Sequence, residues 1–178
     1  MGNPGGGWPG TFEDIRRAYR GLLNVRGQDK VPLFDLNRIC VAGHSAGAQL
    51  ALCLAAVEPS IKHVISLGGV VDLQRAWKLH LGNDAVAEFL GGPPSKMPEN
   101  YSEASPADLR IGAKQVLLHG TNDDSVPYEL SANYVKRKKG SGEDVELITF
   151  KNTGHFELVD PDSAIWEMVL ATFKSSLA

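Results

Sequence analysis

Apolar residues recur along the chain in four short runs, which are separated by longer stretches of mixed composition. The runs cover residues 38–42, 63–67, 115–119 and 145–150. A short run of consecutive apolar residues is typical of a strand in a parallel sheet that is covered on both faces. We therefore expect these runs to be buried parallel strands.

Helical patterns fill the stretches between the runs. Residues 11–24 place their apolar side chains on one face, whereas residues 46–57 are apolar all round and predict a buried helix. Residues 129–139 predict a further helix. The last one is expected over 161–177, with Asp160 as its cap and with one inner stripe. That stripe contains Ile165, Met168, Val169, Thr172 and Phe173.

The alternation of strands and helices predicts an α/β fold with an open, mostly parallel sheet that helices cover on both faces. We expect one domain over residues 1–178, because the chain has 178 residues and no repeat or low-complexity tract. Ligands of such sheets bind outside the carboxyl ends of the strands. Chemistry is therefore expected just beyond the ends of the apolar runs.

Residues 73–107 are too long for a plain connection and contain Trp77 among several large apolar side chains. We interpret this segment as a lid or as a wall of the substrate pocket, and Trp77 as a substrate-binding residue. Simple packing against the core is the alternative interpretation.

Composition and charge are those of an ordinary globular protein, with 43% hydrophobic residues and a formal net charge of −3 at pH 7. Nothing in this balance favours binding to nucleic acid or to a membrane. No stretch approaches the length of a membrane-spanning helix, and the first ten residues contain no charged leader or apolar signal core. Cys40 and Cys53 are expected to be free thiols, so a cytoplasmic location follows by default.

The candidate chemistry begins at Gly43-His44-Ser45-Ala46-Gly47, between the first apolar run and the buried helix. A G-x-S-x-G sequence at a strand-to-helix turn is typical of a nucleophile elbow, which presents the serine hydroxyl to a substrate. The backbone N–H of Ala46, directly after the serine, is then a donor for an oxyanion. The pentapeptide alone is only moderately specific, since glycine and serine also mark ordinary turns.

A serine nucleophile needs a histidine base and a carboxylate that orients it, and both follow later strands. Asp123 and Asp124 come after the third apolar run, and His155 comes after the fourth. The order of serine, acid and histidine is that of the α/β-hydrolase arrangement. The residues themselves leave open whether Asp123 or Asp124 is the acid.

The remaining histidines have simpler interpretations. His44 lies inside the elbow and is expected to shape the pocket and to contact substrate, while His119 closes a strand and is expected to be structural. No cluster of histidine, cysteine and carboxylate residues has metal-ligand spacing, and no phosphate-binding glycine loop is present. We therefore expect neither a metal nor another cofactor.

Taken together, these motifs resemble the α/β-hydrolase family, in its esterase and lipase-like branch related to carboxylesterases and kynurenine formamidases. Besides the elbow, the resemblance rests on Gly7-Trp8-Pro9-Gly10-Thr11, Tyr101-Ser102-Glu103-Ala104-Ser105-Pro106, His119-Gly120 with Asp123 and Val126-Pro127, and Gly154-His155-Phe156. It covers nearly the whole chain and implies a catalytic triad of Ser45, Asp123 and His155. The function implied is that of a serine hydrolase acting on carboxylic esters, with aryl formamides or short peptides as alternative substrates.

Two features depart from the family pattern. The glycine-rich loop that supplies the second oxyanion donor in the family has no counterpart here, and about four strands that normally precede the elbow are missing. We therefore expect an N-terminally truncated hydrolase domain whose first strand has an open edge, through which the chain could self-associate. The alternative to an active enzyme is an impaired or inactive domain that acts through such pairing.

Overall fold

The computed structural model describes residues 6–24, 35 and 38–177, and its described strands form one parallel sheet. The sheet has four strands in the order β1-β2-β3-β4. They are β1 (Cys40–His44), β2 (His63–Leu67), β3 (Lys114–Gly120) and β4 (Val145–Phe150). The predicted α/β class and parallel sheet are confirmed.

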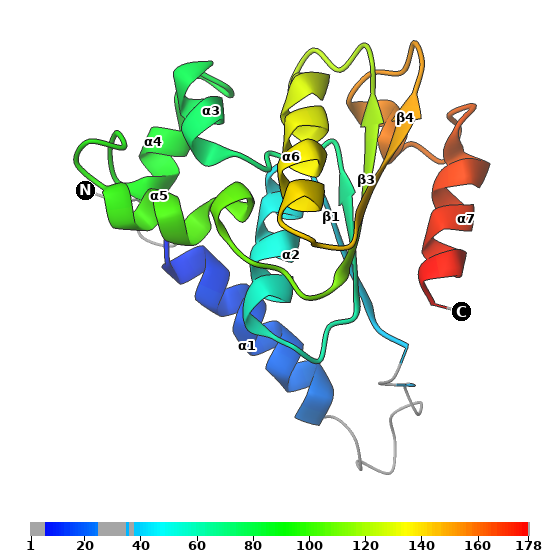
Figure 1. Ribbon diagram of the computed structural model, residues 1–178, viewed down its shortest axis with the longest axis horizontal. Helices are drawn as coiled ribbons and strands as arrows, with labels where there is room; N and C mark the ends of the chain where they lie inside the picture. Colours follow the sequence, from blue (N-terminus) through cyan, green and yellow to red (C-terminus); the bar gives the residue numbers. More distant parts are fainter. Residues whose placement is uncertain (1–5, 25–34, 36–37, 178) are drawn as a thin grey trace.

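Helices surround this sheet on both sides (Figure 1). The longer ones are α1 (Gly10–Asn24), α2 (Ala46–Val57), α6 (Tyr128–Gly140) and α7 (Trp166–Ser176). Residues 73–107 contain α3 (Leu73–Lys78), α4 (Ala85–Leu90), α5 (Pro98–Ala104) and the start of a 3₁₀ turn, η1 (Pro106–Asp108). A second 3₁₀ turn, η2 (Phe156–Leu158), follows β4.

Alternate residues of each central strand enter two separate hydrophobic clusters, one on each face of the sheet. In β3, Leu117 packs into the cluster that contains buried residues of α1, α2 and α6. Its neighbours Val116 and Leu118 pack on the other face, together with Val169 of α7. Because side chains of a strand alternate between faces, an unbroken apolar run is what two covered faces require.

The first strand lies at an edge of the described sheet. β1 pairs with β2 in parallel register, from Cys40 opposite His63 to His44 opposite Leu67, and its other side has no strand partner among the described residues. Self-association through this edge stays a prediction.

The last helix begins later than its sequence pattern predicts. It starts at Trp166, because residues 160–165 form turns in which Asp160 accepts hydrogen bonds from the N–H groups of Asp162 and Ser163. The predicted inner stripe is also wrong at Met168, which is 56% exposed. Val169 is fully buried, so the helix face that packs on the sheet is centred there.

Gly43 and Gly47 of the elbow differ in how closely other atoms approach them. A Cβ atom at Gly43 would overlap the backbone carbonyl group of Gly47, whereas a Cβ atom at Gly47 would meet nothing within 4 Å. The close approach of β1 to α2 therefore depends on Gly43.

We expect the Gly43→Ala substitution to lower the free energy of unfolding by about 3 kcal/mol, because backbone has to move to relieve the overlap. Gly47→Ala is the matched control and is expected to be neutral or slightly stabilising, since alanine is the better helix former. Urea denaturation of both variants measures the difference. Equal losses in the two variants would contradict the assigned contact.

Candidate active site

Ser45 stands at the sharp turn between the end of β1 and the start of α2. Its backbone has φ 56° and ψ −121°, a left-handed conformation that is strained for any residue with a Cβ atom. The turn is held by a hydrogen bond of 2.9 Å from the Ser45 N–H to the carbonyl oxygen of Leu67, at the end of β2. The strand-to-helix turn expected from the G-x-S-x-G sequence is thus present in the structure, with a strained Ser45 at its tip.

His155 follows β4 and lies against Asp123, which follows β3. Nδ1 of His155 is 2.7 Å from Oδ2 of Asp123. An ionised carboxylate only accepts hydrogen bonds, so the proton of the ring resides on Nδ1 and Nε2 is left as a proton acceptor. Both side chains are almost completely buried, which strengthens their interaction.

The orientation of the Asp123 carboxylate is fixed by contacts other than the one with His155. Its Oδ1 accepts hydrogen bonds from the backbone N–H groups of Ser125, at 3.0 Å, and Val126, at 2.7 Å. Its Oδ2 also lies 3.2 Å from Nε2 of His119. The carboxylate therefore has one orientation, with Oδ2 presented to His155.

His119 is a buried structural histidine, as its place at the end of β3 predicts. It is fully buried, with Nδ1 against the hydroxyl of Ser131 at 2.7 Å and Nε2 against the carbonyl oxygen of Val126 at 2.9 Å. Burial lowers the pKa of its imidazole, which favours the neutral ring. A neutral ring bonded in this way donates from Nε2 to Val126 and Asp123.

Of the two aspartates that the sequence leaves open, only Asp123 touches His155. Asp124 is exposed, and its Oδ1 accepts a hydrogen bond from the hydroxyl of Ser125. It lies in the wall of the cavity described below.

The carboxyl end of β2 brings Ser45 and the His155–Asp123 pair to one rim of the sheet. Leu67 holds the backbone of Ser45, and the next residue, Gly68, lies directly against the pair. A Cβ atom at Gly68, where φ is +53°, would be 3.1 Å from both Nδ1 of His155 and Oδ2 of Asp123. Only a residue without a side chain leaves this room. No hydrogen bond joins Ser45 Oγ to His155 among the described residues, and such contacts often tighten only when substrate is bound.

His44 connects the elbow to the histidine. Its Nε2 donates to the backbone carbonyl oxygen of His155 at 3.0 Å, and the two rings lie 4.3 Å apart between centroids. Burial lowers the pKa of His44, so the ring tends to stay neutral beside His155. These contacts support a positioning role for His44, and contact with substrate stays a prediction.

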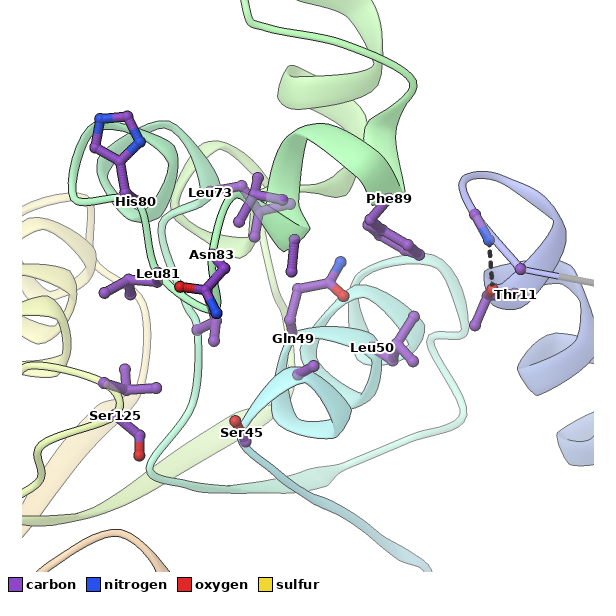
Figure 2. Close-up of a pocket in the computed structure, with 18 of the residues that line it drawn as sticks. Thr11, Ser45, Gln49, Leu50, Leu73, His80, Leu81, Asn83, Phe89 and Ser125 are labelled. Atoms are coloured by element: carbon purple, nitrogen blue, oxygen red, sulfur yellow. Dashed lines mark hydrogen bonds between the residues drawn. The ribbon is translucent and has the colours of Figure 1, made fainter. Parts of the chain in front are cut away.

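A cavity of about 810 Å³ opens beside Ser45 (Figure 2). Its walls come from the start of α2, from the loop after β3, from Gly6, Gly7 and Thr11, and from the segment 73–107. Most of the wall is apolar, with Gln49, Asn83 and Ser125 among the polar side chains that interrupt it. A large apolar space with a few polar groups is typical of a small-molecule site.

Trp77 is half-buried and packs against the core cluster, while the cavity wall of that segment is made by its neighbours Leu73, Leu81 and Phe89. A substrate contact of Trp77 stays a prediction. Gln49 was not predicted as a site residue, although it is the only side chain of the buried helix with strong hydrogen-bonding groups. That isolated amide in an apolar helix was the available signal.

Metal-ligating side chains do not gather in the described part of the chain. No group of three or more histidine, cysteine, aspartate or glutamate residues there is arranged to hold a metal ion. The described helices also include none that is both long and apolar enough to cross a membrane.

The fold, with Ser45 at a strained strand-to-helix turn and an Asp–His pair at the neighbouring strand ends, defines an α/β-hydrolase. The chain belongs to the prolyl oligopeptidase family, whose sequence profile matches residues 14–173. The α/β-hydrolase resemblance is confirmed, since this family model matches most of the chain and esterases are among the solved structures with the same fold.

Individual relatives are similar over most of the chain. The uncharacterised peptidase YtmA of Bacillus subtilis (strain 168) is 28% identical over 165 residues, which cover 87% of this chain and 62% of the relative. This chain thus spans less than two thirds of the length of that relative.

Solved structures share the fold at low identity. The acylaminoacyl peptidase of Pyrococcus horikoshii is 21% identical with a TM-score of 0.75, over 94% of this chain and 28% of that protein. An esterase/lipase from an uncultured bacterium is 18% identical with a TM-score of 0.73, over 97% of this chain and 61% of that protein. Peptidases and esterases therefore share this architecture.

Proposed function

We propose that the chain is a serine hydrolase that cleaves carboxylic esters and related acyl bonds with Ser45, His155 and Asp123. The contact between His155 Nδ1 and Asp123 Oδ2 carries the proposal, because it leaves Nε2 free to take a proton. Ser45 supplies the hydroxyl at the same rim of the sheet. The family supports a hydrolase, and the choice of ester substrates is part of the proposal.

In the proposed reaction, Ser45 Oγ attacks the carbonyl carbon while Nε2 of His155 takes its proton. Asp123 holds the ring in the required tautomer and stabilises the imidazolium that forms. The N–H of Ala46 stabilises the oxyanion; as the first residue of α2, Ala46 has no helical acceptor for this group. His155 then protonates the leaving group, and water hydrolyses the acyl-enzyme by the reverse transfers.

Peptide or acyl-amide bonds are the second candidate. YtmA is named a peptidase, and the Pyrococcus horikoshii protein is named an acylaminoacyl peptidase. Hydrolysis of an ester and hydrolysis of a peptide or acyl-amide bond both proceed through an acyl-enzyme, so the same site chemistry serves either substrate. A cytoplasmic location is also part of the proposal, and the free thiols of Cys40 and Cys53 support it.

Rapid mixing of the protein with p-nitrophenyl butyrate tests the function. The expected trace has a burst of p-nitrophenol, equal to the concentration of active sites, followed by slower steady turnover, because the acyl-enzyme forms before it hydrolyses. Turnover should increase in proportion to protein concentration. Release at the rate of buffer alone, from folded protein, would refute the proposal.

A further inference from the structure

The side-chain amide of Gln49 has a fixed orientation inside the cavity. Gln49 is 3% exposed, and its Nε2 donates to the carbonyl oxygen of Ala104 at 2.7 Å. A carbonyl oxygen only accepts hydrogen bonds, so the nitrogen of the amide has to face Ala104 and the oxygen has to face the other way.

Cys53 completes the anchor of this amide. Its Sγ accepts a hydrogen bond from Nε2 of Gln49 at 3.3 Å and donates to the same Ala104 carbonyl at 3.2 Å. Burial raises the pKa of the Cys53 thiol to about 12, so the thiol keeps the proton that it donates. The nitrogen side of the Gln49 amide is therefore saturated.

The oxygen side of the amide is open. No hydrogen bond among the described residues reaches Oε1 of Gln49, and Gln49 lines the cavity together with Ser45, one helical turn earlier. Figure 2 shows the amide at the tip of the Gln49 side chain, between Asn83 and Leu50. An acceptor that faces the cavity without a protein partner favours a ligand that brings a donor.

The part of the substrate that meets this oxygen follows from the position of the base. The leaving group receives its proton from His155, so it has to lie on the His155 side of Ser45. The cavity lies beside Ser45 with α2 and the segment 73–107 in its wall, and His155 is absent from the described lining residues. The acyl group consequently occupies the cavity, close to Gln49.

The charges of the lining favour donors over anions. Asp124 is in the wall, no lysine or arginine is among the described lining residues, and the histidine there, His80, is already paired with Asp84 at 2.6 Å. A carboxylate on the substrate would therefore lack a cation, whereas an N–H group finds an acceptor in Oε1.

We propose that Gln49 is a specificity residue, which selects neutral acyl groups that carry an N–H donor, such as N-acylated amino acid esters, through a hydrogen bond to Oε1. This inference rests on the proposed function for the placement of the acyl group. Recognition itself needs no turnover, so it can be measured in protein that lacks the nucleophile.

Binding to the Ser45→Ala protein, followed by NMR titration, tests the inference. The probes are methyl esters of N-acetylglycine, N-acetyl-β-alanine and N-acetyl-γ-aminobutyric acid, each beside the ketone analogue in which CH₂ replaces N–H. For at least one spacer length, the N–H ester is expected to bind about fivefold more tightly than its ketone. The side-chain amide resonances of Gln49 should shift more with that ester than with its ketone.

Two further substitutions in the same protein locate the effect. Gln49→Met keeps the length of the side chain without the acceptor and should abolish the preference, whereas Cys53→Ala disturbs the anchor but keeps Oε1 and should retain it. Equal binding within every pair, or a preference that survives Gln49→Met, would overturn the inference. If Gln49→Met does not fold, an equal response of the Gln49 amide resonances to the ester and the ketone would overturn it. None of these results depends on whether the unsubstituted protein hydrolyses esters.

Discussion

Replacing Ser45 by alanine is expected to lower kcat for p-nitrophenyl butyrate by roughly a thousandfold to a millionfold. The hydroxyl is the group that forms the acyl-enzyme, and the strained turn after β1 presents it at the same rim of the sheet as the His155–Asp123 pair. The initial burst of p-nitrophenol should disappear together with steady turnover. Stopped-flow absorbance measures both.

The control for this variant is Ser102→Ala, which removes an exposed hydroxyl on α5 that bonds to the Glu99 carbonyl. It should leave kcat unchanged. Turnover that survives in Ser45→Ala at the level of this control would contradict the assignment of the nucleophile.

The backbone strain at Ser45 predicts an effect of substitution on stability as well as on activity. Its φ of 56° and ψ of −121° lie in a region that glycine enters without steric cost. Ser45→Gly should therefore raise the free energy of unfolding by about 1 kcal/mol relative to Ser45→Ala while remaining inactive. A variant that is more stable yet inactive would show that the strain serves the site and not the fold.

Replacing Asp123 by asparagine is expected to lower kcat by about four orders of magnitude without unfolding the protein. Oδ1 accepts the backbone N–H groups of Ser125 and Val126, so the amide oxygen of asparagine has to take that place. The NH₂ group then faces Nδ1 of His155, while Nε2 of His119 keeps the carbonyl oxygen of Val126 as its acceptor. That nitrogen becomes an acceptor, and the ring proton moves to Nε2, which can no longer take a proton from Ser45.

Asp124→Asn is the matched comparison, because Asp124 is the adjacent carboxylate and makes no contact with His155. It should change kcat by no more than a few-fold. The pH profile of kcat/KM for the active variant should keep its shape. If Asp124→Asn lost more activity than Asp123→Asn, the assignment of the acid would have to be reversed.

Much of the fold was predictable because a strand that is buried on both faces needs an unbroken run of apolar residues. The bounds of β2, α2 and β4 agree with the apolar runs. β1 lies two residues further along than its apolar run, because Gly43 and His44 pair with β2 through backbone groups that hydropathy does not register. The late start of α7 has a similar cause, since the turn bonds of Asp160 compete with helix formation.

The site was predictable to the extent that it follows strand ends. Ser45, Asp123 and His155 each lie within five residues after the end of a strand, and parallel strands bring such positions to one rim. The residues of the cavity wall were harder to predict from the sequence, because they come from segments whose spacing along the chain follows no known motif. Gln49 of α2 and Asn83 of the segment 73–107 both line the cavity, and only the packing of the helices shows that they share a wall.

The central claim is that Ser45 is a nucleophile activated by His155. Treatment of the protein with a fluorophosphonate, followed by mass spectrometry of the digested chain, tests it most directly. We expect one phosphonyl group on the peptide that contains Ser45, with labelling that is lost in Ser45→Ala and strongly slowed in His155→Ala. An unlabelled folded protein, or a label on another residue that persists in Ser45→Ala, would contradict the claim.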